Sequence, residues 1–272
     1  MATTTSGGCK IWYDTMGEGP PVVMVYGIGG NSRGWWDDFP ALLARRYRLV
    51  MLDNRGTGNS EKPETAWTMP DMTADVLAVA DAAGLESFHL LGCSLGSMIV
   101  RHLVRQHGGD RIRSLSLLCP PNGIAATDAD RNAALFWDRT KPLIESARAG
   151  WPIIHPGPWI AANDARLVAK FEASQLEPTP PRTFVFQFQA ATDAGDANSA
   201  LNDHDWPVLI AHGTLDRLVP PGNAHTLKQQ VPRARLEMLE GDSHNFWAHD
   251  PERAAAIVLD FLDAAERRHV GK

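Results

Sequence analysis

The chain has 272 residues, of which 44% are hydrophobic and 21% are charged. This is the composition of an ordinary globular protein, and it excludes an intrinsically disordered chain. The formal net charge of −6 argues against non-specific binding to nucleic acid or to an anionic membrane surface. No apolar run approaches the roughly 18 residues that a membrane-spanning helix needs.

Three cysteines, Cys9, Cys93 and Cys119, are scattered along the chain. An odd number of cysteines without a C-x-x-C spacing predicts neither a disulfide framework nor a cysteine-based metal site. The first residues lack the apolar segment that a signal peptide requires. We therefore expect a reduced protein that stays in the cytoplasm.

In chain order, residues 3–5 and 9–13 first predict a small antiparallel hairpin at a sheet edge. Six short apolar runs follow, at residues 22–26, 47–52, 88–92, 112–119, 208–212 and 236–239. Several of them lack alternation, which is typical of strands buried on both faces. Amphipathic helical patterns lie between the runs. This order predicts an α/β protein with a mostly parallel central sheet flanked by helices.

The strand–helix rhythm stops between about residues 121 and 204, where aromatic residues and prolines accumulate. An insertion of this size between two sheet strands predicts a helical lid. Residues 1–120 and 205–272 would then form the core domain. Within the insertion, residues 183–188 alternate aromatic and other side chains, which by period alone would indicate a strand; that assignment stays open.

The strongest motif is Gly92-Cys93-Ser94-Leu95-Gly96, which follows an apolar run and opens an amphipathic helix. This is the context of a G-x-S-x-G nucleophile elbow, in which a sharp turn lifts the serine hydroxyl above the sheet. A plain strand–helix turn would not need both glycines. We therefore predict Ser94 as a nucleophile. Cys93 should point the opposite way, into the packing.

A serine hydroxyl needs a base, and the base needs an orienting acid. The motif's chain order is serine, then acid, then histidine. Asp216 comes just after the run at residues 208–212, and His244 follows the next run. We assign Asp216 as the acid and His244 as the base. Asp242 is the competing acid, but it lies only two residues from His244 in one tight loop.

Acyl transfer also needs backbone donors for the developing oxyanion. The N–H of Leu95, the residue after the nucleophile, should be one donor. The second should come from the glycine-rich loop after residues 22–26, with Ile28 preferred and Gly29 second. The alternative is a glycine-rich turn without a chemical role. A nucleotide-binding loop is disfavoured, because neither G-x-G-x-x-G nor a Walker A pattern is present.

Other polar residues have a simpler interpretation. The segment from Asp53 to Ser60 predicts a structural loop, with Arg55 bonded to carboxylates or carbonyls. His89 and His212 fall inside strand runs and are expected to be structural. His155 and His204, in or beside the lid, remain weaker candidates for substrate contact.

Together these motifs resemble the α/β-hydrolase superfamily, in particular its cap-bearing enol-lactonases, carboxylesterases, C–C bond hydrolases and cofactor-free haloperoxidases. The resemblance covers nearly the whole chain and rests on Gly27-x-Gly29-Gly30, Asp53-x-Arg55-Gly56-x-Gly58-x-Ser60, Gly92-x-Ser94-x-Gly96, Gly213-x-x-Asp216-x-x-x-Pro220 and Gly241-x-x-His244. These motifs specify the fold much better than the substrate. The resemblance implies a helical cap over residues 121–204, with residues 183–188 in a helix. Tyr26 departs from the pattern, because the family usually has a histidine there.

The prediction is a serine-dependent hydrolase that forms an acyl-enzyme and uses no metal or organic cofactor. The aromatic lid favours a small to medium, largely apolar ester or lactone, with Gly29, Trp137 and Trp159 as substrate-binding candidates. The expected partner is this small molecule, not nucleic acid or a membrane, and a homodimer is left open.

Three alternatives stay open. The same constellation could cleave a carbon–carbon bond. It could serve a cofactor-free, non-hydrolytic reaction on a polyketide-like substrate, with His244 as base. The fold could also belong to a ligand-binding receptor, although the complete triad favours an enzyme.

Overall fold

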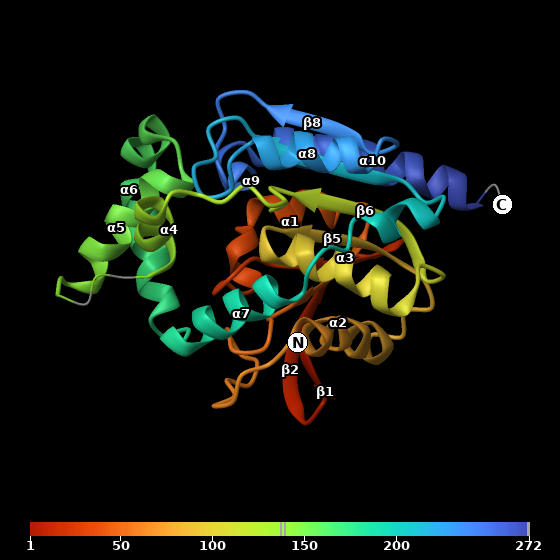
Figure 1. Ribbon diagram of the computed structural model, residues 1–272, viewed down its shortest axis with the longest axis horizontal. Helices are drawn as coiled ribbons and strands as arrows, with labels where there is room; N and C mark the ends of the chain where they lie inside the picture. Colours follow the sequence, from red (N-terminus) through yellow and green to blue (C-terminus); the bar gives the residue numbers. More distant parts are fainter. Residues whose placement is uncertain (137, 139, 271–272) are drawn as a thin grey trace.

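The computed structural model describes residues 1–136, 138 and 140–270. An eight-stranded sheet runs through the molecule in the order β1-β2-β4-β3-β5-β6-β7-β8 (Figure 1). The strands are β1 Ala2–Ser6, β2 Cys9–Met16, β3 Pro21–Val25, β4 Arg48–Leu52, β5 Phe88–Cys93, β6 Ile112–Leu118, β7 Val208–Gly213 and β8 Arg235–Leu239. The strands from β4 to β8 in this order pair in parallel, which confirms the α/β class. The β1–β2 hairpin is antiparallel and lies at the edge, as predicted.

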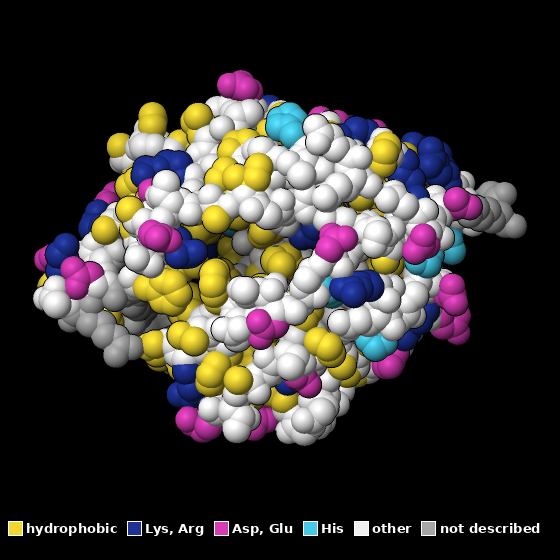
Figure 2. Space-filling view, in the orientation of Figure 1, with side chains coloured by type: hydrophobic (Ala, Val, Ile, Leu, Met, Phe, Trp, Pro, Cys, Tyr) yellow, Lys and Arg dark blue, Asp and Glu magenta, His cyan; other side chains and the backbone are white. Residues whose placement is uncertain are grey.

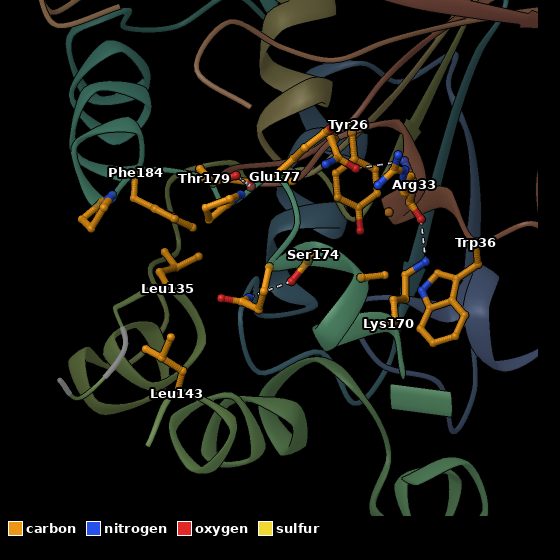
Figure 3. A pocket seen from close by; sticks show the side chains of 18 of the residues that line it. Tyr26, Arg33, Trp36, Leu135, Leu143, Lys170, Ser174, Glu177, Thr179 and Phe184 are labelled. Carbon is orange, nitrogen blue, oxygen red and sulfur yellow. Dashed lines mark hydrogen bonds between the residues drawn. The ribbon is translucent and has the colours of Figure 1, made fainter. Parts of the chain in front are cut away.

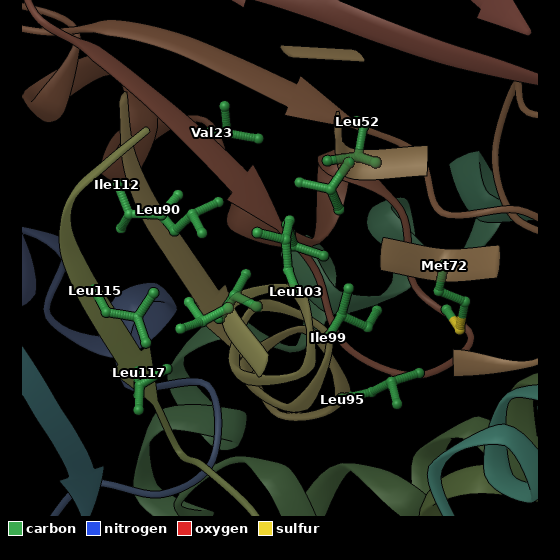
Figure 4. Close-up of a cluster of buried hydrophobic side chains, with 14 of the residues drawn as sticks. Val23, Leu52, Met72, Leu90, Leu95, Ile99, Leu103, Ile112, Leu115 and Leu117 are labelled. Atoms are coloured by element: carbon green, nitrogen blue, oxygen red, sulfur yellow. The ribbon is translucent and has the colours of Figure 1, made fainter. Parts of the chain in front are cut away.

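The central strands are apolar on both sides because each face packs against its own layer of helices. Val23 and Leu90 belong to one buried cluster, which also contains Met72 and Leu103 (Figure 4). Their neighbours Val22 and Leu91 point to the opposite face and join a second cluster. Since alternate residues of a strand face opposite sides, two cores form on one sheet. Each fully buried aliphatic side chain contributes about 1.5–3 kcal/mol.

The helices of the two layers are α1 Asp38–Leu43, α2 Met69–Ala82, α3 Leu95–His107, α8 Gly222–Gln230, α9 Phe246–His249 and α10 Pro251–Val270. Helix α2 begins with a capping box, in which Thr68 and Asp71 bond each other's backbone N–H groups. Two 3₁₀ turns, η1 Ser32–Trp35 and η2 Ser199–Asp203, complete the regular structure. No helix among the described residues is long and apolar enough to cross a membrane.

Among the described residues, four α-helices lie between β6 and β7: α4 Asp128–Leu135, α5 Leu143–Ile154, α6 Gly157–Ser174 and α7 Pro181–Asp193. We call them the inserted helices. Figure 1 shows α4, α5 and α6 beside one end of the sheet, with α7 returning towards α2 and α3. On the face seen in Figure 2, hydrophobic side chains surround a hollow between these helices and the rest of the molecule.

Residues 183–188 belong to helix α7, not to a strand. The helix begins at Pro181, which is favourable in a first turn. Its buried residues are Thr183, Gln187 and Ala190, and their spacing follows the helical period. The strand-like alternation of phenylalanines misleads because the side chains that face inwards include a threonine and a glutamine.

Candidate active site

Ser94 sits in a strained turn between β5 and α3. Its backbone has φ 51° and ψ −123°, a region that non-glycine residues rarely adopt. A Cβ at Gly92 would lie within 3.0 Å of the Gly96 carbonyl, and one at Gly96 within 3.0 Å of the Val25 carbonyl. Both glycines of the motif are therefore required by close packing. The resulting turn presents a single serine, 6% exposed, at the carboxyl end of the sheet.

The predicted acid and base lie in contact. The His244 Nδ1 atom is 2.7 Å from Asp216 Oδ2. The other carboxylate oxygen, Oδ1, accepts hydrogen bonds from the backbone N–H groups of Leu218 and Val219 at 2.9 and 2.8 Å. The carboxylate is thereby locked towards the imidazole. This is the arrangement that fixes the tautomer of a general base.

The surroundings of Asp216 stabilise its negative charge. Burial alone would raise the pKa of its carboxyl, but the His244 charge and hydrogen bonds from His212 and His244 outweigh it. The pKa falls to about 2. His212, on β7, has its Nε2 atom 3.2 Å from Asp216 Oδ2. Asp216 therefore remains a carboxylate at neutral pH, in a site where it is fully screened from solvent.

Asp242, the competing acid, turns away from His244. Its carboxylate lies 3.1 Å from His249 Nδ1 and 3.5 Å from an Arg253 guanidinium nitrogen. His249 in turn meets His155, whose Nδ1 atom is 2.8 Å from His249 Nε2. Asp242 thus anchors a buried histidine pair between α9 and the end of α5. The geometry assigns the contact with His244 to Asp216.

Among the described residues, no hydrogen bond joins the distal nitrogen of His244 to Ser94. His244 Nε2 lies 3.7 Å from the Cys119 sulfur. Ser94 and Cys119 adjoin, because the Ser94 N–H donates to the carbonyl of Leu118 at 2.9 Å. Resting sites often hold such contacts longer than in the reacting complex. Cys119 therefore connects the two parts of the candidate site: its thiol lies against His244, and its backbone follows the residue that accepts from the Ser94 N–H.

The glycine-rich loop after β3 closely approaches the serine. A Cβ at Gly27 would lie 3.1 Å from Ser94 Cβ. Within the described part of the chain, the N–H groups of Ile28 and Leu95 donate to no protein acceptor. The Gly29 N–H, in contrast, donates to Gln187 Oε1 at 2.7 Å. Of the two loop candidates, Ile28 keeps its donor free and Gly29 does not.

A cavity of about 980 Å³ opens between this loop and the inserted helices (Figure 3). Its apolar lining includes Leu135, Phe136, Leu143 and Phe184. Gly29, one predicted substrate-binding residue, also lines it. The size and lining suit a small-molecule ligand.

The two tryptophans predicted to bind substrate have different outcomes. Trp159 is not among the lining residues; its ring stacks on His155 at 4.8 Å and packs edge-on against Trp36 at 5.7 Å. Trp36 does line the cavity. Trp137 lies outside the described residues. Trp159 therefore packs behind Trp36 and does not itself line the cavity.

The loop at residues 53–60 is structural, as expected. Arg55 makes a two-pronged contact with the buried Asp75, with both N···O distances 2.6 Å. Asp53 accepts hydrogen bonds from the backbone N–H groups of Ser32 and Asn59, each at 2.8 Å. Cys93 is also structural: it is buried, and burial raises the pKa of its thiol well above the ordinary value. Neither group offers an acid, base or nucleophile to the cavity.

Three buried side chains, those of Cys119, Asp216 and His244, are close enough together to be considered as metal ligands. One ligand atom each from Cys119, Asp216 and His244 lies within 4.8 Å of the others. However, Asp216 already engages two histidines and two backbone N–H groups. Burial also raises the pKa of the Cys119 thiol, which opposes the thiolate form that binds metals. This donor set suits a hydrogen-bonded acid–base pair better than a metal centre.

Sequence reasoning missed Gln187 and the contact role of Cys119, and it treated His212 as merely structural. The contact of His212 with Asp216 could have been predicted, because His212 lies near the end of β7, four residues before Asp216. Gln187 has no local signal, since it lies 158 residues from its partner Gly29. Cys119 could have been suspected only from its place at the end of the strand beside the elbow.

The fold and the elbow together define an α/β protein with a hydrolase-like site at the carboxyl end of its sheet. The model of the alpha/beta hydrolase fold family matches residues 20–250. The chain belongs to the α/β-hydrolase fold family and is a hydrolase of that family.

Two bacterial relatives are similar over most of the chain. One, described as a putative carbamate hydrolase RutD from Azorhizobium caulinodans, is 29% identical over 96% of this chain and 98% of its own. A protein of the same description from Caulobacter vibrioides is 31% identical over 90% of each chain.

Solved structures agree on the fold. The esterase RhEst1 from Rhodococcus sp. ECU1013 superposes with a TM-score of 0.86 at 26% identity, covering 97% of this chain and 98% of its own. The enol-lactonase from Burkholderia xenovorans LB400 gives a TM-score of 0.76 at 22% identity, covering 96% and 100%. The second similarity shows the fold alone.

Proposed function

We propose that this protein is a serine hydrolase of small to medium, largely apolar carboxylic esters or lactones. The observation that carries the proposal is the 2.7 Å contact between His244 and a locked Asp216 carboxylate, next to a strained serine elbow. A serine placed this way is activated by a base whose tautomer is fixed. The similarity to a solved esterase supports the ester class.

In the proposed reaction, Ser94 Oγ attacks the carbonyl carbon while His244 Nε2 accepts the hydroxyl proton. Asp216 stabilises the resulting imidazolium. The N–H groups of Leu95 and Ile28 donate to the developing oxyanion. His244 then protonates the leaving oxygen, and the acyl-enzyme forms. A water molecule, deprotonated by His244, attacks that ester and releases the acid.

We further propose that residues 121–204 act as a cap on a core of residues 1–120 and 205–272. The support is the position of the cavity, which has walls from both parts: Gly29 and Tyr26 from the core, and Leu135 and Phe184 from the inserted helices. A wall built on an insertion can change substrate selection without moving the elbow.

A carbamate is the second candidate substrate, because two relatives over most of the chain are described as putative carbamate hydrolases. The chemistry differs little, since the serine attacks a carbonyl carbon in both cases. A carbamoyl-enzyme would then replace the acyl-enzyme. Comparing kcat/KM for the hydrolysis of a carbamate with kcat/KM for the matching ester distinguishes the two substrates.

Covalent labelling tests the proposed nucleophile. A fluorophosphonate probe should label the wild-type protein, and Ser94→Ala should abolish labelling together with hydrolysis of p-nitrophenyl esters. Ser174→Ala is the matched control, because this exposed serine lines the same cavity and should leave labelling intact. Labelling that persists in Ser94→Ala would assign the nucleophile to another residue.

A further inference from the structure

One wall of the cavity carries hydrogen-bond donors that have no acidic partner. Tyr26, Arg33 and Lys170 all line it. In Figure 3 the Tyr26 ring points into the cavity, with Lys170 beside Trp36 on the same side. The Tyr26 hydroxyl makes no hydrogen bond with any described residue. Burial, followed by the neighbouring Cys93 and Cys119, raises the pKa of this phenol well above its ordinary value, so it stays a donor.

The tyrosine is held in a slot built for its ring. A Cβ at Gly30 or at Gly34 would lie within 3.0 Å of ring carbons of Tyr26, so no larger residue fits at either position. Trp35 and Trp247 contact the ring edge-to-face, at centroid distances of 5.1 and 6.1 Å. The ring therefore cannot turn its hydroxyl elsewhere without disturbing four neighbours. A rigid donor of this kind costs little conformational entropy when a ligand binds.

Lys170 brings a positive charge to the same wall. Its Nζ atom donates to the Arg33 carbonyl at 2.6 Å and lies 4.2 Å from the centre of the Trp36 ring. No carboxylate of the described residues lies within 4.0 Å of it, and the same holds for the Arg33 guanidinium. Burial lowers the pKa of Lys170 to about 8, against the effect of the Asp37 charge. The ammonium group is thus mainly protonated at neutral pH.

Two other charges of the cavity lining have partners of their own. Arg166, which also stacks on Trp36, pairs with Asp38 at 2.5 Å. Glu177 faces the side-chain amide of Asn59, whose nitrogen lies 2.8 and 3.0 Å from the carboxylate oxygens when the amide is oriented to donate. Asp37 is exposed and makes no contact within 4.0 Å of Lys170 among the described residues. Tyr26, Arg33 and Lys170 thus offer donors with no carboxylate within 4.0 Å among the described residues, and Asp37 is the one acidic lining residue for which the described residues show no partner.

This wall begins next to the residue that approaches the elbow, although Ser94 itself is not among the lining residues. Tyr26 directly precedes Gly27, the residue that approaches Ser94. A ligand that reaches from the serine along this loop would enter the wall that carries Tyr26 and Lys170. Its polar end must supply acceptors to use Tyr26, Arg33 and Lys170, because all three side chains offer donors. A carboxylate fits both the donors and the charge.

We infer that Tyr26 and Lys170, with Arg33 at the rim, form a carboxylate-binding subsite, so the substrate is an ester or lactone with an apolar body and a terminal carboxylate. The inference rests on the proposed function and narrows its substrate class. The oxygens of the carboxylate would accept hydrogen bonds from the phenol and the ammonium group, while the apolar body contacts Leu135 and Phe184.

Matched substrates test this subsite. The p-nitrophenyl half-ester of adipic acid carries a free carboxylate, and p-nitrophenyl methyl adipate has the same chain with that carboxylate capped. The measured quantity is the ratio of kcat/KM for the half-ester to kcat/KM for the diester. We expect a ratio of about ten or more in the wild type, because charge-assisted hydrogen bonds are the stronger kind. Lys170→Met, which keeps the stem over Trp36, should lower the ratio about tenfold.

Tyr26→Phe should lower the same ratio of kcat/KM values severalfold. This variant tests the subsite by itself if Lys170→Met does not fold. Lys141→Met, which removes an exposed lysine of the insertion, should leave the ratio at the wild-type value. A wild-type ratio at or below one, or a ratio that neither Tyr26→Phe nor Lys170→Met changes, would overturn the subsite.

A binding measurement separates this inference from the proposed function. Calorimetry compares monomethyl adipate with dimethyl adipate on the Ser94→Ala protein, where turnover plays no part. Tighter binding of the monoacid that is lost in Ser94→Ala/Lys170→Met supports the subsite even if no ester is hydrolysed. Serine-dependent ester hydrolysis without any preference for the monoacid supports the function and rejects the subsite.

Discussion

Gln187 on α7 accepts a hydrogen bond from the Gly29 N–H at 2.7 Å, so an inserted helix holds the loop proposed to form the oxyanion hole. Thr179 holds the same residue from its other side, because its hydroxyl donates to the Gly29 carbonyl at 2.9 Å. Phe184 fills the space where a Gly29 side chain would be. Gln187 is 0% exposed, so water cannot replace its acceptor.

Gln187→Met should therefore reduce kcat by about tenfold or more while KM changes little. The substitution leaves the Gly29 N–H without an acceptor, and the loop can relax and shift the Ile28 donor. Steady-state kinetics with a p-nitrophenyl ester measures both constants. Gln189→Met is the control, since Gln189 is exposed on the same helix and its side-chain amide donates to Asp193 on the next helical turn. A proportional rise in KM with unchanged kcat would show that Gln187 shapes substrate binding instead.

Asp216→Asn should keep the fold and lower kcat by about 10²–10⁴, as loss of the tautomer-fixing acid does in other triads. Asp242→Asn should stay near the wild type, because Asp242 contacts His249 and Arg253 and not His244. Kinetics of the two variants, with circular dichroism to check folding, compares the assignments. An inactive Asp242→Asn beside an active Asp216→Asn would reverse them.

The low pKa of Asp216, about 2 when folded, also predicts a pH dependence of stability. An aspartate in the unfolded chain titrates near 3.9. The folded state therefore binds this proton less readily, so the contribution is complete above about pH 4 and is lost as the pH falls towards 2. Urea unfolding of wild type and Asp216→Asn should show a stability gap at pH 7 that narrows by pH 3. An equal gap at both pH values would contradict the assignment.

Phe136 and Trp159 should respond differently to truncation. Phe136 lines the cavity and is 39% exposed, so Phe136→Ala should change the acyl-chain-length profile of kcat/KM with little change in Tm. Trp159 packs on His155 and Trp36, so Trp159→Ala should lower Tm by several degrees. Ester series from acetate to octanoate and thermal melts provide both readouts. If both variants only lose stability, the inserted helices do not set acyl selectivity through these rings.

The native thiols should resist alkylation. Burial raises the pKa of Cys9 to about 11, and it raises those of Cys93 and Cys119 well above the usual value. Because the thiolate is the reactive form, iodoacetamide at pH 8 should leave the folded protein unmodified. Mass spectrometry after unfolding in guanidinium should instead find all three cysteines labelled. Rapid labelling of Cys119 in the folded protein would show that its pocket opens to solvent.

The sequence predicts the sheet well because buried parallel strands have a local signature. The apolar runs of β3, β5 and β7 match the structure to within one or two residues at either end. The positions of Ser94, Asp216 and His244 are equally local, since each follows a strand at the same edge of the sheet. For these residues, chain order and topology are enough to bring the side chains together.

The cavity could not be predicted in the same way, because its walls depend on contacts between distant segments. Gln187 looks like any polar residue of a helix, and its role appears only when α7 meets the loop at Gly29. Trp159 and Phe136 are both aromatic residues of the insertion, and nothing in the sequence tells which one lines the cavity. Packing between α5, α6 and η1 decides that question.

The slot around Tyr26 links three positions that are not adjacent in the sequence. A chain with tyrosine at this place must keep positions 30 and 34 without side chains, or else move the ring. These three residues should therefore change together in evolution, and a histidine at position 26 would release the constraint from at least one glycine. Tyrosine together with both glycines would then be a sequence marker for relatives that present the same phenol to their substrates.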